Sequence, residues 1–126
     1  MRGLGEHVVL VEPDECAARS YEDVLTDAGL SVVTIDNAEG ALRICAELCA
    51  TVDLVITRAA LTNINGMELA RQIEHLHRIP VLLISQFSRQ LLSQARGFSH
   101  HLDILEEPFS LRELVLNARE ALCREI

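Results

Sequence analysis

The sequence predicts an α/β fold in which a doubly wound parallel sheet lies between two layers of helices. Two observations predict it. Short runs rich in valine, isoleucine and leucine alternate along the 126 residues with amphipathic stretches, as in chains of repeated strand–helix units. Several of these runs are continuously apolar, which is typical of parallel strands buried on both faces. Right-handed crossovers between such strands favour a five-stranded sheet in the order 2-1-3-4-5.

Five apolar runs are expected to form the strands. They are His7–Val11, Ser31–Ile35, Asp53–Thr57, Pro80–Ile84 and His101–Leu105. The first, third and fourth of these are the most continuously apolar and should be the central strands of the sheet.

Five helices are expected, one after each strand. They cover about Asp14–Ala28, Asp36–Ala50, Asn65–His75, Ser88–Arg96 and Ser110–Cys123. Gly29 is a typical helix stop. Asp36 with Glu39, and Ser110 with Glu113, have the spacing of capping boxes and predict two of the helix starts.

The composition indicates one globular domain spanning residues 1–126, since 49% of the residues are apolar and 24% are charged. A net charge of −8 argues against nucleic-acid binding, which needs clustered positive charge. No apolar run approaches the roughly 18 to 20 residues of a membrane span. The first residues also lack the features of a signal peptide. We therefore expect a cytoplasmic location, with neither nucleic acid nor membrane as a partner.

Neither a metal site nor a cofactor is predicted. The cysteines, Cys16, Cys45, Cys49 and Cys123, form no Cys-x-x-Cys pair, so we interpret them as small core residues in a reducing compartment rather than as ligands. All eleven basic residues are arginine, which excludes lysine-based chemistry such as a Schiff base.

Function is expected at the carboxyl ends of the strands, where doubly wound sheets place their sites. Those positions follow Val11, Thr57, Ile84 and Leu105. The candidate site residues there are Glu12, Pro13, Arg58, Ser85, Gln86 and Glu107. Asp14, close to the first strand end, is interpreted as a helix N-cap and not as a ligand.

Two further segments complete a pattern that resembles the response-regulator receiver domain family, of which the protein CheY is typical. They are Asn65-Gly-Met-Glu-Leu69 after the third strand and Pro108-Phe-Ser-Leu111 after the fifth. The resemblance covers roughly residues 6 to 123 and implies a flavodoxin-like (βα)5 three-layer sandwich. It also implies a phosphorylation pocket, in which the tip of the third strand carries the aspartate that accepts phosphate.

The strand ends depart from that family pattern in ways that would remove its chemistry. Arg58 stands at the position of the phospho-accepting aspartate, and an arginine cannot form an acyl phosphate. Pro13 replaces the second acid of a magnesium-binding pair, and Glu107 replaces a lysine. Ser85 keeps the family's hydroxyl, but the bulkier Gln86 follows it. The resemblance therefore implies a degenerate pocket with very weak magnesium binding or none.

Arg58 and Glu107 reverse the signs of the two charges that the family places at these positions. We predict that Arg58 bridges Glu107, Glu12 or both, because a guanidinium offers a fork of donors that suits two carboxylates. The alternative is that Arg58 extends into solvent and leaves Glu107 unpaired.

The resemblance also implies an output face, formed in the family by the fourth helix, the fifth strand and the fifth helix. Ile104 stands where receivers carry an aromatic switch residue, and it has no ring to rotate. It is expected to be a fixed contact on an interaction face with Phe98, Leu102 or Leu91. The alternative is that these are ordinary core residues, and for Leu91 and Leu102 that alternative is favoured.

The sequence thus favours a phosphorylation-independent pseudo-receiver in bacterial signal transduction, a protein-interaction module and not an enzyme. Its expected partner is a histidine kinase or another signalling protein, or a second copy, bound through the output face. The alternative is a receiver-like switch regulated by an anion or small ligand held by Arg58 and Ser85. An enzyme is weakly supported, since Glu12-Pro13 stands where a glycine-rich phosphate loop would be needed and Ser85 has no evident base.

Overall fold

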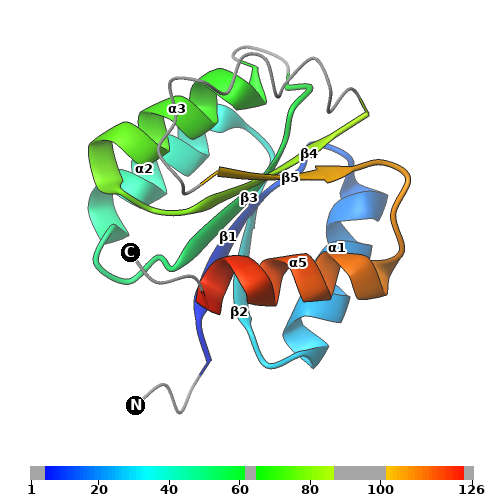
Figure 1. Cartoon of the computed structure of the whole chain (residues 1–126). Helices are drawn as coiled ribbons and strands as arrows, with labels where there is room; N and C mark the ends of the chain where they lie inside the picture. The colour runs from blue at the N-terminus through cyan, green and yellow to red at the C-terminus, as the bar shows by residue number, and fades with distance from the viewer. Residues whose placement is uncertain (1–4, 62–64, 87–101, 124–126) are drawn as a thin grey trace.

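The computed structural model describes residues 5–61, 65–86 and 102–123, and it shows a parallel sheet between two helical layers (Figure 1). The five strands are hydrogen-bonded in the order β2-β1-β3-β4-β5. They are β1 (His7–Val11), β2 (Ser31–Ile35), β3 (Leu54–Arg58), β4 (Val81–Ser85) and β5 (Leu102–Glu106). The predicted fold class and strand order are both confirmed.

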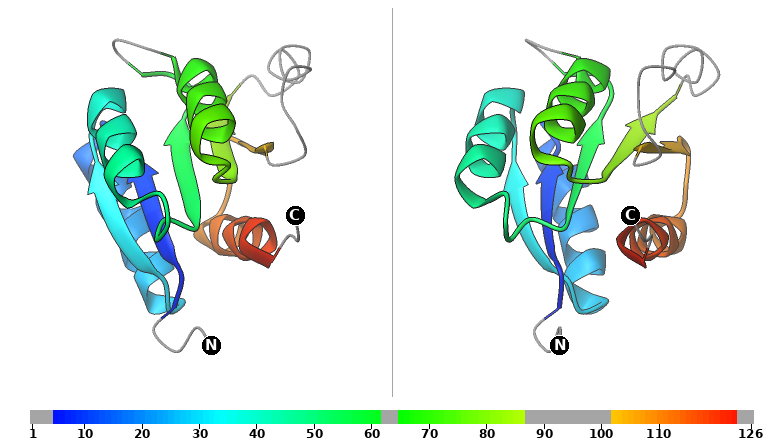
Figure 2. Two further views of the ribbon diagram at one scale, coloured as in Figure 1. Left: turned by 90° about the vertical axis from the view of Figure 1, so that its left-hand side faces the viewer. Right: turned by 60° about the vertical axis from the view of Figure 1, so that its left-hand side comes forward.

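Within the described residues, helices cover both faces of the sheet (Figures 1 and 2). They are α1 (Glu15–Asp27), α2 (Ala38–Leu48), α3 (Gly66–His77) and α5 (Leu111–Cys123). The pair α1 and α5 lies on one face, and α2 and α3 lie on the other. The helix predicted at Ser88–Arg96 falls outside the described residues. No helix in the described part of the chain has the length and apolar character needed to cross a membrane.

The strands divide their side chains between two cores, as alternation along a strand requires. Val8 and Leu10 of β1 belong to the core beneath α1 and α5. Val9 and Val11 belong to the core beneath α2 and α3. Because both faces are filled, the central strands are buried along almost their whole length, and the polar residues of β3 and β4 lie at their carboxyl ends.

The start of α2 differs from the prediction. Asn37, and not Asp36, is its N-cap: the Asn37 side chain accepts from the backbone N–H of Gly40 at 2.7 Å, and Asn37 has extended backbone angles. Asp36 instead accepts a hydrogen bond from the Asn37 side-chain amide. The capping box predicted for Ser110 and Glu113 is confirmed, since each accepts a hydrogen bond from the other's backbone N–H.

Three strands are displaced by one residue from the predicted ranges. The strands predicted from Asp53 and from Pro80 begin one residue later, and the fifth, predicted to end at Leu105, ends at Glu106. At β3 the tertiary ladder explains the shift. Asp53 leaves the strand because its carboxylate accepts the backbone N–H of His7, whereas Arg58 pairs with Ile84 of β4. Arg58 is therefore the last residue of a central strand.

Candidate functional site

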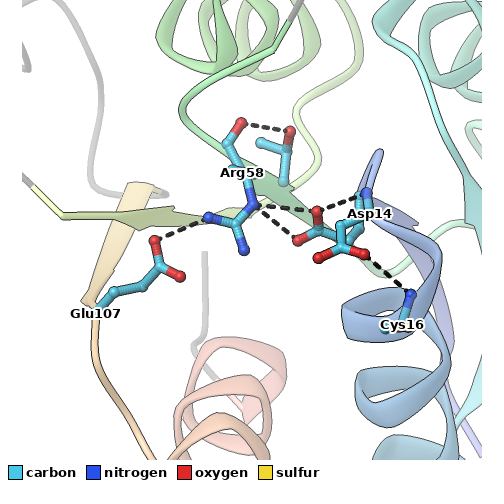
Figure 3. Close-up of polar contacts among 6 residues, drawn as sticks. Asp14, Cys16, Arg58 and Glu107 are labelled. Atoms are coloured by element: carbon cyan, nitrogen blue, oxygen red, sulfur yellow. Dashed lines mark hydrogen bonds and ion pairs between the residues drawn. The ribbon is translucent and has the colours of Figure 1, made fainter.

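Arg58 lies between two carboxylates at the carboxyl edge of the sheet, and we call Glu12, Arg58 and Glu107 the ion triad. Arg58 Nε donates to Glu12 Oε1 at 2.9 Å and to Oε2 at 3.1 Å. On the other side, Arg58 Nη1 donates to Glu107 Oε1 at 2.9 Å. Figure 3 shows the guanidinium reaching Glu107 in one direction while its Nε–H points the opposite way. The predicted bridge is therefore present, and it reaches both carboxylates.

Glu12 is the buried member of the ion triad. It follows β1 directly and is 2% exposed. Besides Arg58, its Oε2 accepts the backbone N–H of Asp14 at 3.1 Å, and its own backbone N–H donates to the carbonyl of Ile35. Asp14 in turn accepts the N–H of Cys16 and caps α1, as predicted. A carboxylate removed from water needs such partners, and Arg58 supplies the charged one.

Glu107 is the outer member and lies in the connection from β5 to α5. Its side chain is 18% exposed, against 21% for Arg58 and 1% for Glu12. Its backbone N–H donates to the carbonyl of Ser85, at the end of β4, at 2.9 Å. The ion triad thus joins the ends of three strands, β1, β3 and β5.

The backbone around Arg58 is held by its neighbours. The N–H of Ala59 donates to the carbonyl of Ile84, and the N–H of Gly66 donates to the carbonyl of Ala59. Gly66, the first residue of α3, lies so close to β3 that an added Cβ would be 2.2 Å from the Arg58 carbonyl oxygen. A glycine is therefore required there, and α3 fixes the position from which the Arg58 side chain projects.

The electrostatics of the ion triad favour a permanently charged arginine. Burial lowers the pKa of Arg58, but the hydrogen bonds and charges of Glu12 and Glu107 raise it, and the net effect is a pKa above the ordinary value. One guanidinium faces two carboxylates, so the local charge is negative overall. An added anion would have to compete with carboxylates that are already in contact with Arg58.

Tyr21 is a neighbour of the ion triad that the sequence interpretation did not single out. Its ring packs against Phe109 with ring centroids 5.7 Å apart. The pKa of Tyr21 is raised above its ordinary value, and burial is the largest cause. The charges of Glu12 and Glu107 also raise this pKa, whereas the charge and hydrogen bond of Arg58 lower it. The signal in the sequence is helical spacing, since Ala18 and Leu25 lie on the same inward face of α1.

Four of the six predicted site residues line one cavity, and Glu12 joins them through its contact with Arg58. A cavity of about 150 Å³ is lined by Arg58, Ser85, Gln86 and Glu107, with Ser85 buried and Gln86 exposed. Pro13 lies apart from it, on an open groove between α1 and the start of α2 that Glu12 also lines. The cavity is therefore lined by only four of the six predicted site residues.

The residues at the strand ends do not fit a magnesium ion, which the family resemblance implies at this place. Magnesium is held by one or two carboxylates with waters in near-octahedral geometry. Both oxygens of Glu12 face the Arg58 guanidinium, and Pro13 offers no side-chain oxygen. Among the described residues, no three His, Cys, Asp or Glu side chains are grouped as ligands. A cation at this position would meet the positive charge of Arg58.

Two residues predicted on the output face can be placed. Leu102 and Ile104 are partly buried on β5, and Leu102 packs against the core beneath α2 and α3. Phe98 and Leu91 lie outside the described residues. Whether these residues form an interaction face stays a prediction.

Comparison with known proteins gives a consistent result. The family described as "Response regulator receiver domain" matches residues 8–119. A response regulator, ArlR, from Staphylococcus epidermidis is 30% identical over 120 residues, which cover 94% of this chain and 53% of that protein. A sensor kinase, CckA, from Brucella abortus is 25% identical over 116 residues, covering 91% of this chain and 12% of the kinase.

The fold comparison agrees. The crystal structure of a signal receiver domain of an HD domain-containing protein from Pseudomonas fluorescens superposes with a TM-score of 0.84 at 23% identity, covering 97% of this chain and 90% of that one. The chain spans about half the length of the ArlR proteins that it matches.

Proposed function

Because the chain belongs to the response regulator receiver domain family of two-component signalling, we propose that it is a pseudo-receiver whose state does not depend on phosphorylation. It acts as a regulatory protein-interaction module in the cytoplasm and catalyses no reaction. The observation that carries this proposal is the ion triad, in which Arg58 contacts both Glu12 and Glu107.

The chemistry of the ion triad supports the proposal in three ways. A guanidinium at the end of β3 offers no carboxylate to attack a phosphoryl group, and its positive charge disfavours a metal beside it. Glu107 places negative charge where the oxygens of a transferring phosphoryl group would need a cation. The nucleophile and cation positions thus carry residues of the opposite charge, and a metal would lie beside the positive charge of Arg58.

The proposed partner is a histidine kinase or another signalling protein, or a second copy of the chain. The surface proposed for it is the outer side of α5 with the adjoining part of β5. Leu111 and Leu116 on α5 are 43% and 55% exposed. Ile104, on β5, is proposed as a fixed contact at the edge of this surface, on the same face of the sheet as Leu102. That one relative is a sensor kinase supports a kinase-linked role.

The alternative, a switch operated by an anion or small ligand at Arg58 and Ser85, receives less support. The Arg58 guanidinium is already engaged by two carboxylates. The cavity beside it, of about 150 Å³, is also small compared with typical ligand pockets of about 300–1,000 Å³.

The experiment that tests the proposal is a backbone amide NMR titration with magnesium and beryllofluoride, a mimic of the acyl phosphate. The native chain is expected to show no saturable shifts at residues 12, 58, 85 and 107. The matched control is the variant Pro13→Asp, Arg58→Asp, Glu107→Lys, which restores the residue types that the family resemblance implies. Shifts in that variant would show that the assay detects a working pocket. Saturable shifts in the native chain that extend to Ile104 would reject the proposal.

A further inference from the structure

The connection between β5 and α5 is held by contacts at both of its ends. At its start, the Glu107 side chain accepts from Arg58 and the Glu107 backbone N–H donates to the Ser85 carbonyl, both at 2.9 Å. Near its end, the Phe109 ring packs against Tyr21 of α1. Only Ser110 then separates Phe109 from the first residue of α5.

The connection leads directly into the capped start of α5. Ser110 caps the helix through its reciprocal hydrogen bonds with Glu113. Leu114, at 0% exposure, then anchors the inner side of α5 in the core, while Leu111 and Leu116 remain exposed. A displacement of the connection would therefore displace the start of α5 and the exposed Leu111, its first residue.

The ion triad is asymmetric, and the asymmetry indicates which side can move. Arg58 is fixed by the buried Glu12 and by a backbone tied to β4 and α3. Glu107 is the more exposed carboxylate, in a short connection outside regular structure. Loss of the contact from Nη1 to Glu107 leaves Arg58 held by Glu12. The connection from β5 to α5 then loses its side-chain contact with β3 and keeps only the backbone bond to Ser85 and the packing of Phe109 on Tyr21.

We infer that Arg58 is a positioning residue: through Glu107 it fixes the connection from β5 to α5, and it thereby holds the outer side of α5 in one arrangement without any phosphate. The inference rests on the proposed function in one respect, namely that this side of α5 is the surface offered to a partner. The mechanical coupling from β3 to α5 is independent of that and can be measured on the chain alone.

The test is amide hydrogen exchange measured by NMR on the variant Glu107→Ala. Removal of a hydrogen bond to a charged group is expected to speed exchange about fivefold at the amides of residues 107–115, Pro108 having none, because local opening there becomes easier. Exchange in β1 and β2 is expected to stay unchanged. The matched control is Glu120→Ala, which removes the same charge from the exposed side of α5 and should leave exchange at 107–115 as in the native chain.

Two outcomes would overturn the inference. Unchanged exchange at 107–115 in Glu107→Ala would show that Arg58 does not position the connection. An equal acceleration throughout β1 and β2 would show a general loss of stability instead of a local release. If Glu107→Ala fails to fold, Glu107→Met, which keeps a similar side-chain size but has no acceptor oxygen, is measured by the same criteria.

Failure of this inference and failure of the proposed function give different results. The exchange experiment contains no phosphoryl mimic, metal or partner. A native chain that responds to beryllofluoride, together with local release in Glu107→Ala, would reject the pseudo-receiver proposal and retain the positioning role of Arg58. No response to beryllofluoride, with unchanged exchange, would do the reverse.

Discussion

At the scale of single residues, the guanidinium of Arg58 can hold two carboxylates because its N–H groups point in different directions. Glu12 receives Nε–H and Glu107 receives an Nη1–H. The two contacts have different energetic weight, since Glu12 is buried and Glu107 is partly exposed to water. Replacement of Arg58 should therefore be costly mainly through Glu12.

We expect Arg58→Met to lower the free energy of unfolding by about 3–5 kcal/mol, because it leaves the Glu12 carboxylate buried without a charged partner. The double variant Arg58→Met, Glu12→Gln should regain part of the loss, since the buried charge is then gone. Urea unfolding measures both values. The control Arg43→Met, on the exposed side of α2, should change stability by no more than about 0.5 kcal/mol. A loss in Arg58→Met as small as in the control would contradict this expectation.

Cys45 gives a prediction about pH. Burial raises its pKa from 9.0 to about 11, so the folded chain holds this proton more tightly than the unfolded chain. Stability should therefore fall as the pH rises from 9 towards 11, and the contribution of Cys45 should be constant below pH 9. Denaturant unfolding at several pH values should show a smaller alkaline loss in Cys45→Ala than in the native chain. Equal losses in the two proteins would count against it.

At the scale of elements, the close contact of α3 with β3 predicts a steric effect. Gly66→Ala would bring a methyl group to 2.2 Å from the Arg58 carbonyl oxygen, which belongs to a central strand and cannot easily move. We expect a loss of about 1–3 kcal/mol in unfolding free energy. The control is Gly40→Ala in the first turn of α2, where the added methyl meets only side-chain atoms, first of all the Ile35 methyl. A loss at position 66 no larger than at position 40 would show that α3 can shift away from β3.

The elements also show what the sequence could and could not predict. Alternating apolar runs and helix spacing were sufficient for every described strand and helix, because those signals are local. The start of α2 was misplaced because Asp36 and Asn37 are both good cap residues, and only the backbone angles decide between them. The end of β3 was misplaced because Arg58 is charged, although the ladder with β4 continues through it.

The candidate site follows the same division. Topology places the strand ends along one edge, so residues from 12 to 107 could be grouped before any coordinates were known. Tyr21 lies next to the site because α1 packs against the β5–α5 connection. That packing between distant segments leaves no local pattern in the sequence. The isolation of Pro13 from the cavity likewise depends on the direction of the chain after β1.

At the scale of the whole molecule, the ion triad should make stability insensitive to magnesium. A ligand that binds only the folded state raises its stability, and the oxygens of Glu12 are engaged by Arg58. We expect the thermal midpoint to be the same in about 10 mM magnesium chloride as in sodium chloride of equal ionic strength. The variant Pro13→Asp, Arg58→Asp, Glu107→Lys should be stabilised by magnesium under these conditions. A rise in the midpoint of the native chain would indicate a metal site that includes residues outside the ion triad.

The ion triad also has a consequence for how this chain could change over generations. Its three members come from distant points of the sequence, and each one is suited to the charges of the others. A single change of Arg58 to aspartate would add a third carboxylate between Glu12 and Glu107, and it would weaken the fold. A single change of Glu107 to lysine would set two cations against each other. Exchange of the charges of the ion triad therefore requires several substitutions together, and the single steps lead through less stable proteins.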